Sequence, residues 1–483
     1  MSKLNKELNR AIIHSLTGKY SLYIFQILSL AVLSRIFTPE MFGALAAVQM
    51  LVMFFQLVSN SGLAPAVVYQ DKIDRDIRDG LFSFTFLFAC GLTLIFLLFG
   101  SGLLNWLGLA EYETLVYVLA VSVFSSALSM LPAACLQKDA KFLAMAQAEI
   151  FAELVAFSVC IAMYYADFGF IALAMKFALT PLFRLIFYYL KAGNTTLGRP
   201  KFGKQIGAIK LFFDFAKFQF LFQLVNFFSR NLDTLLITKY FGAATIGFYE
   251  KSYQVMRYPL QLFTFAITPA LQPVLTKYKG QPELVETAYY RVIYKLALLG
   301  CAVAFVLFWA ADDVVFIMFG AQWHQTAPIL SLLAVSIPLQ MVLSSTGGVY
   351  QAFGFTKQQL WCGLFSAATN VTAISLGVYW HDLELLCLLL VSAFIINYLQ
   401  CFILLQFMVF KTGLHFRFWL ISLLILLPYC NLLIHWRVEQ NAETMLSALY
   451  QSSVISAASF ALVALIYFAT KGLMESHTKL KSS

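Results

Sequence analysis

Long runs of apolar residues recur along almost the whole chain, and they limit its possible folds more than any other feature. We count fourteen runs of roughly twenty residues, the length at which a helix crosses about 30 Å of hydrocarbon. With 61% hydrophobic and 12% charged residues, no single soluble core could cover this much apolar surface. The sequence therefore predicts an all-α polytopic membrane protein. The expected spans are 16–37, 41–64, 81–104, 113–136, 144–165, 168–190, 211–237, 244–271, 289–311, 326–350, 358–379, 384–408, 417–436 and 446–470.

The distribution of positive charge predicts the topology of these spans. Of the Lys and Arg residues outside or at the ends of the runs, 24 fall in the termini and even-numbered connections, and three fall in the odd-numbered ones. Cytoplasmic connections of membrane proteins are enriched in Lys and Arg. We therefore expect a multi-pass protein of the cytoplasmic (inner) membrane with both termini in the cytoplasm. The same bias explains the net charge of +9, so no nucleic-acid partner is predicted.

An internal repeat with an offset of 204 residues divides the chain. The segment "SRIFTPEMFG" ends the first run and "TKYFGAATIG" ends the seventh. The matching pairs are Arg35 and Lys239, Phe37 and Phe241, Gly43 and Gly247, and Pro65-Ala66 with Pro269-Ala270. Six spans per half make the repeats parallel, with an axis along the membrane normal. We expect two pseudo-symmetric six-helix lobes and two appended C-terminal helices.

These expectations divide the chain into six parts. They are a cytoplasmic N-terminal segment at 1–15, an N-lobe at 16–191, a basic cytoplasmic linker at 192–210, a C-lobe at 211–411, the last two helices at 412–470 and a cytoplasmic tail at 471–483.

The seventh run carries a polar stripe along one face. Its members are Gln219, Gln223, Asn226, Arg230 and Asp233. On a helix they fall within an arc of about 80° and extend over about 21 Å. A central Arg or Asp in a bilayer costs roughly 2.5–3.5 kcal/mol. Either Arg230 and Asp233 neutralise each other inside the bundle, or the stripe lines a water-filled cavity, which the three amides favour.

The first, second and eighth runs carry similar polar faces. Because the first and second runs correspond to the seventh and eighth, we expect each half to contribute one wall of a central cleft. The candidate substrate-contacting residues are Lys19, Tyr23, Gln26, Gln49, Gln56, Asn60, Gln219, Gln223, Asn226, Arg230, Asp233, Glu250, Tyr253, Arg257 and Gln261.

The fifth and sixth runs hold another set of charges. Glu149 and Glu153 lie one helical turn apart, and Lys176 lies well inside the next run. Two such carboxylates should not both ionise in a membrane without a nearby cation. Either Lys176 forms a structural ion pair with them, or one of the carboxylates takes part in ion coupling.

Motifs for catalysis and for metal binding are missing from the sequence. The eight cysteines are dispersed without a CxxC pair, the histidines lack metal-ligand spacing, and no GxxxxGK[ST] loop occurs. The "DRD" segment at 74–76 alternates with cations, which is typical of a solvated loop. We expect a protein that is not an enzyme and has no cofactor, with its cysteines in packing roles.

Three motifs resemble those of a known transporter family. They are "LSRIFTPEMFG", "SRNLDTLLITKYFGAATIGFYEKSY" and "GAQWHQTAPILSLLAV". In this order and spacing they are similar to Wzx-type polysaccharide flippases of the multidrug/oligosaccharidyl-lipid/polysaccharide exporter superfamily, with the colanic-acid and lipopolysaccharide exporter branch closest. The resemblance implies a V-shaped two-lobe bundle, alternating access, and oligosaccharide repeat units on polyprenyl pyrophosphate as substrate. It also implies a cationic cavity, which Lys19, Arg230 and Arg257 match and which Asp233 and Glu250 dilute.

The resemblance therefore predicts a flippase for O-antigen, capsule or exopolysaccharide assembly, with Lys19, Gln26, Arg230 and Arg257 contacting pyrophosphate and glycan. Its expected partners are the lipid-linked oligosaccharide, membrane lipid and a polysaccharide polymerase or export machinery, and the protein is expected to be a monomer. Two alternatives remain open. A membrane-embedded polymerase or ligase usually has a long outer loop, and a drug/cation antiporter of the same superfamily usually has twelve spans.

Overall fold

The computed structural model describes residues 20–60, 67, 73–276, 278, 280–413, 416–434 and 445–479. This part of the chain consists of helices and their connections and contains no strand. Every predicted span overlaps a described helix or, at 326–350, a bent pair of helices. Nine of the described helices, or ten counting the bent pair once, are long and apolar enough to cross a membrane. The all-α, multi-pass class is confirmed, whereas the count of fourteen crossings stays a prediction.

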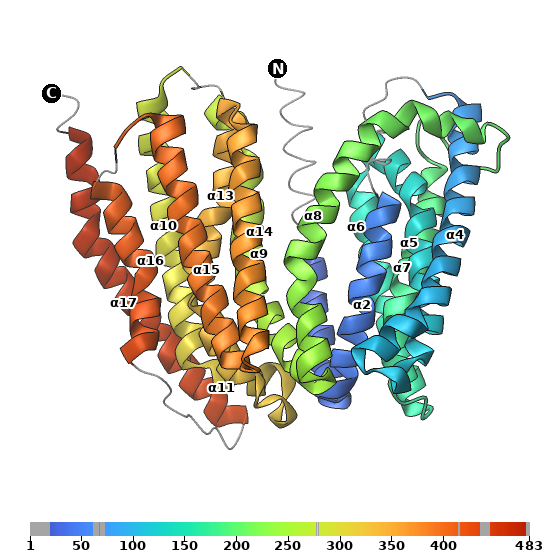
Figure 1. The fold of residues 1–483 in the computed structure, drawn as a ribbon, viewed down its shortest axis with the longest axis horizontal. Helices are drawn as coiled ribbons and strands as arrows, with labels where there is room; N and C mark the ends of the chain where they lie inside the picture. The colour runs from blue at the N-terminus through green and yellow to red at the C-terminus, as the bar shows by residue number, and fades with distance from the viewer. Residues whose placement is uncertain are drawn as a thin grey trace. The chain divides into compact units, whose positions relative to one another are not determined.

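Contacts divide the chain into two compact units, Met1–Gly247 and Phe248–Ser483. In the first unit, α4, α5, α6 and α7 run side by side (Figure 1). The helices of this unit are Tyr20–Ile36, α2 (Pro39–Asn60), α4 (Arg75–Leu107), η1 (Ala110–Tyr112), α5 (Thr114–Lys138), α6 (Phe142–Tyr165), α7 (Phe170–Ala192), η2 (Ile206–Ile209) and α8 (Lys210–Phe241). Helix α9 (Ala243–Thr276) begins in this unit and continues in the second.

A row of small residues lets α6 and α7 pack closely. Ala148, Ala152, Ala156 and Cys160 follow one another at intervals of four on α6, and all are buried. Small side chains at this spacing allow helix backbones to approach in a membrane, where apolar burial between helices gains little. The other side of α6 exposes large apolar groups such as Phe151, as a lipid-facing surface does.

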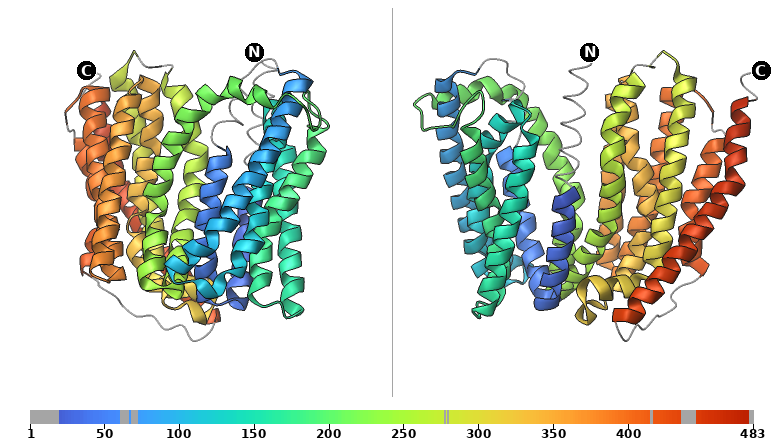
Figure 2. Two further views of the ribbon diagram at one scale, coloured as in Figure 1. Left: turned by 45° about the vertical axis from the view of Figure 1, so that its right-hand side comes forward. Right: turned by 180° about the vertical axis from the view of Figure 1, so that it is seen from behind.

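The second unit is organised around α10 (Figure 2), against which α13, α16 and α17 pack. Its helices are α10 (Pro282–Trp309), α11 (Ala311–Phe319), η3 (Ala321–Trp323), α12 (Thr326–Ala334), α13 (Ile337–Phe353), α14 (Thr356–Tyr379), α15 (Leu383–Leu404), η4 (Leu405–Phe410), α16 (Phe416–Ile434) and α17 (Met445–Lys479). Buried tyrosines fill its core, and their hydroxyls find partners: Tyr289 bonds Ser345 at 2.9 Å and Tyr398 bonds Ser422 at 3.0 Å. Such pairing removes most of the penalty of burying a phenol.

The predicted span 326–350 is broken. Helices α12 and α13 meet at an angle of 53° around Val335 and Ser336. Pro338 explains the break, because it has no N–H to donate and its ring would clash with the carbonyl of Ala334 in a continuous helix. The Ser336 hydroxyl donates to the Leu333 carbonyl at 2.6 Å and completes the end of α12.

The starts of two helices in the repeated motifs follow the 204-residue offset. Helix α2 begins at Pro39, and α9 begins 204 residues later, at Ala243. The two helix starts also lie against each other. A Cβ on Gly43 would lie 1.7 Å from the Ala243 carbonyl oxygen, and one on Gly247 would lie 2.1 Å from the Pro39 carbonyl oxygen. This reciprocal contact is the pattern that a two-fold axis between equivalent segments produces.

The contact units do not coincide with the expected lobes. Phe54 of α2 packs on Phe227 and Phe228 of α8, with ring centroids 5.6 and 6.0 Å apart, and contacts group α8 with the first unit. The repeat assigns α8 to the second half. The lobe boundaries at 192–210 and 411 therefore stay a prediction, which rests on the sequence repeat and not on the contacts.

Candidate functional site

The two charges of the α8 stripe lie in different surroundings. Arg230 is exposed, whereas Asp233 is buried and accepts a hydrogen bond from the Thr234 amide at 2.8 Å. Among the described residues, Arg230 and Asp233 form no ion pair with each other.

The amides of this stripe are described only in part. Gln223 is half-buried, and the side chains of Gln219 and Asn226 lie outside the described atoms. Helix α8 is 32 residues long and α9 is 34, so each is long enough to cross a membrane.

The face of α9 carries a second exposed arginine. The guanidinium carbon of Arg257 lies 4.9 Å from the ring centroid of Tyr253, which is itself buried against Tyr249. A cation held by an aromatic face keeps its N–H groups available for an anion. Glu250 and Gln261, on the same helix, are half-buried.

The polar residues near the N-terminus lie within the first unit. Tyr23 and Gln26 are half-buried on helix Tyr20–Ile36, as is Gln49 on α2. The Gln56 amide donates to the Ser126 hydroxyl of α5 at 3.0 Å, a bond of the kind that joins neighbouring membrane helices. Lys19 and the side chain of Asn60 lie outside the described residues.

The charged set of α6 and α7 forms a buried ion pair. The Lys176 ammonium lies 2.6 Å from a Glu153 carboxylate oxygen, and both side chains are more than nine-tenths buried. The Thr180 hydroxyl donates to the other oxygen of Glu153 at 3.3 Å. Glu149 instead accepts from the Tyr188 hydroxyl at 2.9 Å. Each carboxylate thus has its own partner, one charged and one neutral.

The sequence analysis missed two polar residues of α7 that belong to this charged set. Tyr188 bonds Glu149, and Arg184 lies within electrostatic range of Tyr188. Lys176, Thr180, Arg184 and Tyr188 follow one another at intervals of four, which places them on one face of α7. This four-residue spacing was the sequence signal that could have identified Arg184 and Tyr188.

A buried cation of the second unit was also missed. Lys251 of α9 is buried, with its ammonium 5.5 Å from the Trp323 ring centroid and 5.8 Å from that of Phe319. Next to it, the Ser252 hydroxyl donates to the Thr326 carbonyl at 2.9 Å. The segment "FYEKSY" therefore packs directly on "GAQWHQTAPIL". Gly43 of the first motif meets Gly247 of the second, so the second motif packs on each of the other two.

The described residues contain no group of His, Cys, Asp or Glu side chains that could hold a metal ion. The candidate residues that the structure describes are instead amides, phenols, two carboxylates and two exposed guanidinium groups. This set can bind hydroxyls and phosphates, since amides and phenols exchange hydrogen bonds with sugars and guanidinium pairs bidentately with phosphate.

Comparisons with known proteins identify the family of the chain. Residues 32–328 match the family described as "Polysaccharide biosynthesis protein". The chain is 25% identical over 334 residues to the teichuronic acid biosynthesis protein TuaB of Bacillus subtilis, covering 68% of each chain. It is 21% identical over 372 residues to the succinoglycan biosynthesis transport protein ExoT of Rhizobium meliloti, covering 77% of this chain and 74% of that one.

Among solved structures, the chain resembles the lipid II flippase MurJ in an inward closed conformation. The TM-score is 0.73 at 14% identity, covering 96% of this chain and 100% of that one. A likeness at this identity shows the fold alone. The family match covers more than half of the chain and agrees with the motif resemblance. The chain therefore belongs to the polysaccharide biosynthesis protein family.

Proposed function

We propose that this protein carries polyprenyl-pyrophosphate-linked oligosaccharide repeat units across the cytoplasmic membrane for O-antigen, capsule or exopolysaccharide assembly. In this proposal both termini face the cytoplasm, and a monomer works by alternating access. Membership of a polysaccharide biosynthesis family supports the pathway, and a relative named as a transport protein supports movement rather than synthesis. A polymerase or export machinery would then receive the repeat units.

The observation that carries the proposal is the state of Arg230. It is an exposed guanidinium on a long helix of a membrane protein, without an ion pair among the described residues. Such a charge is unfavourable unless water or an anion meets it. Guanidinium binds phosphate through two parallel hydrogen bonds. A diphosphate passing along α8 would supply that partner, and Arg257, stacked on Tyr253, offers a second.

The other polar residues have matching roles in this proposal. Lys19 and Gln26 join the two arginines as contacts for pyrophosphate and glycan, and the remaining amides and tyrosines contact sugar hydroxyls. Asp233 and Glu250 orient the cations or couple transport to an ion gradient. The polyprenyl tail stays in lipid, so only the head group needs a polar route.

The reciprocal contact of Gly43 and Gly247 supports a pivot between the two repeats. Each glycine faces the backbone of the equivalent helix start, so the segments touch without any intervening side chain. Helices that meet through small residues can change their crossing angle without repacking large groups. We place the fixed point of the alternating-access motion at this crossing.

The transport proposal is tested on a strain that lacks this chain. Polyprenyl-linked lipids are extracted, and a membrane-impermeant sugar-modifying reagent reports the leaflet of each oligosaccharide. We expect complete repeat units to accumulate on the inner leaflet. Repeat units that reach the outer leaflet without being joined would indicate a polymerase instead, and an unchanged lipid-linked pool would indicate a small-molecule antiporter.

The pivot is tested by adding a side chain at the crossing. Gly43→Val should abolish export, because its Cβ would overlap the Ala243 backbone. Gly102→Val is the matched control, since a Cβ there meets nothing within 4 Å. Because the contact is reciprocal, Gly247→Val should act as Gly43→Val does. Export by either variant at the level of Gly102→Val, with equal protein in the membrane, would contradict the pivot.

A further inference from the structure

The segment from Asn194 to Gln205, which we call the strap, is bonded to the first unit along its whole length. At its start, Lys141 donates to the Asn194 carbonyl. Asp139 accepts from both the amide and the hydroxyl of Thr196, at 2.7 and 2.6 Å. Since Asp139 and Lys141 belong to the turn between α5 and α6, this half of the strap is fixed to that turn.

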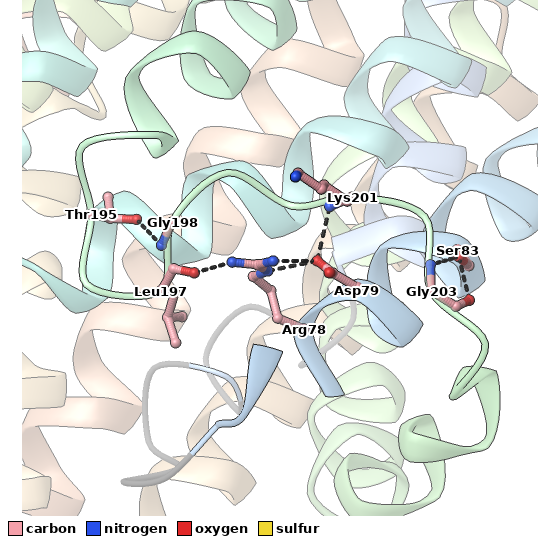
Figure 3. Close-up of polar contacts among 8 residues, drawn as sticks. All are labelled: Arg78, Asp79, Ser83, Thr195, Leu197, Gly198, Lys201 and Gly203. Atoms are coloured by element: carbon pink, nitrogen blue, oxygen red, sulfur yellow. Dashed lines mark hydrogen bonds and ion pairs between the residues drawn. The ribbon is translucent and has the colours of Figure 1, made fainter. Parts of the chain in front are cut away.

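The second half of the strap is bonded to the start of α4 (Figure 3). Arg78 donates to the Leu197 carbonyl, and its guanidinium pairs with the Asp79 carboxylate at 2.6 Å. Asp79 also accepts from the Lys201 amide at 2.9 Å. Ser83 donates to the Gly203 carbonyl and accepts from the Gly203 amide, both at 2.8 Å.

Glycines bring the strap into direct contact with the backbone of α4. A Cβ on Gly80 would lie 2.2 Å from the Gln205 carbonyl oxygen, and one on Gly203 would lie 2.7 Å from the Asp79 backbone. Because its peptide groups are hydrogen-bonded at both ends and the two backbones are in contact, the backbone of the strap is held in a fixed position on α4.

Three of the side chains that the strap exposes are cationic. Arg199, Lys201 and Lys204 are exposed, and none of them forms an ion pair within the described parts of the chain. Asp79 binds the backbone of Lys201, and the ammonium of Lys201 points away from it (Figure 3). Arg199 lies over the Tyr189 ring at 5.5 Å. The positive charges therefore remain available to an anion.

An aromatic residue between these cations marks the level of the membrane surface. Phe202 is 67% exposed, yet its ring lies 5.3 Å from those of both Phe82 and Phe86 on the membrane-spanning helix α4. An exposed aromatic side chain at the start of a span, flanked by cations, is typical of the interface between hydrocarbon and head groups. The strap thus lies where lipid phosphates are.

We infer that the strap is a docking surface for the head groups of anionic phospholipids in the inner leaflet. Lys201 and Lys204 meet the phosphates, Phe202 enters the hydrocarbon edge, and the bonds to Arg78, Asp79 and Ser83 keep this arrangement rigid. The inference rests on the orientation in the proposed function, in which the strap is cytoplasmic. Basic residues next to a span attract anionic lipid by about fivefold in affinity for each cation, which corresponds to about 1 kcal/mol.

The test uses the full chain in nanodiscs of phosphatidylcholine with increasing phosphatidylglycerol, and measures retained phosphatidylglycerol by native mass spectrometry. The double substitution Lys201→Gln and Lys204→Gln should weaken retention by about tenfold or more. Lys357→Gln, an isolated lysine of the other unit, is the matched control and should leave retention unchanged. The double variant should keep the wild-type Tm, because neither ammonium makes an ion pair within the part of the chain that the structure describes.

Three outcomes decide the inference. Retention by the double variant equal to that of the wild type would overturn it. Displacement of the lipid by millimolar inorganic pyrophosphate would also overturn it, because the surface would then select a diphosphate rather than a membrane lipid. Loss of retention in the double variant, restored by Lys201→Arg with Lys204→Arg, would support it. None of these readouts requires transport, so failure here and failure of the flippase assay are separate results.

Discussion

Lys176 and Arg230 are both cations on helices that the sequence places in the membrane, and their surroundings differ completely. Lys176 is buried between α6 and α7 with a carboxylate 2.6 Å away. Arg230 is exposed on α8 and has no ion pair in the described structure. A charge that is paired at close range inside a bundle holds helices in register, whereas an unpaired one keeps its capacity to bind a ligand. We interpret Lys176 as a structural charge and propose Arg230 as a functional one, and substitutions can test this interpretation.

The largest effect is expected from removing half of the buried pair. Lys176→Leu should destabilise the protein by about 3–5 kcal/mol, because Glu153 would be left buried without its counter-charge. Thermal unfolding in detergent, monitored as the loss of monodisperse protein, measures this destabilisation.

The control for that change is the double variant Lys176→Leu with Glu153→Leu. Removing both charges leaves no uncompensated group, so stability should return to within about 1 kcal/mol of the wild type. A double variant as unstable as the single one would mean that packing around α6 and α7, and not the pair, was responsible.

The next effect is on transport rather than on stability. Arg230→Ala should abolish export while the protein remains inserted at its normal level, because the side chain holds no ion pair in the described structure. Arg230→Lys should keep only part of the activity, since an ammonium cannot bind a phosphate bidentately. Export is followed by complementation of the deletion strain, and protein level by immunoblot of membranes.

An opposite result for Arg230 would reverse the comparison. If Arg230→Ala disappears from the membrane, the guanidinium has a structural partner in the working protein, as Lys176 has. The Arg257→Ala variant then shows whether the stacked arginine of α9 carries the anion-binding role alone.

A smaller effect is expected at Glu149, which the sequence could not separate from Glu153. Its partner is the neutral Tyr188 hydroxyl at 2.9 Å. Glu149→Gln keeps an acceptor for that bond, so it should cost about 1 kcal/mol or less, and export should continue. Export lost in a stable Glu149→Gln protein would instead assign this carboxylate to ion coupling.

The sequence was sufficient to predict the apolar helices, and the reason is physical. A span requires about twenty apolar residues, and such runs are visible along one chain. The offset between Gly43 and Gly247 was visible too, because both glycines must admit a backbone. What was missed depends on partners from other helices: Tyr188 on Glu149, Ser126 on Gln56, and the rings around Lys251. Periodicity gives the face of one helix but not the neighbour that covers it.

The motifs illustrate the same limit. They identified the family, and it was natural to expect substrate contacts in them. In the structure, Ser252 bonds the Thr326 carbonyl, and Gly43 meets the helix start at Ala243, so motif residues are used where helices join. A sequence pattern can therefore identify a fold through its helix junctions, whereas the substrate contacts proposed for the α8 stripe stay a prediction.

The smallest effect concerns a third kind of charge, buried but unpaired. Asp313 of α11, between two spans, is fully buried, and neither carboxylate oxygen has a hydrogen-bond partner in the described structure. Burial, with a contribution from the neighbouring Asp312, raises the pKa of Asp313 to about 6. Because the raised pKa means that folding disfavours the ionised form, stability is highest at acidic pH and falls as pH rises from about 4 through 6. Asp313→Asn should therefore raise Tm by about 2 °C at pH 7.5 and leave it unchanged at pH 4. A Tm that falls at pH 7.5 would mean that the ionised carboxylate has a partner, and Asp313 would then belong with Lys176.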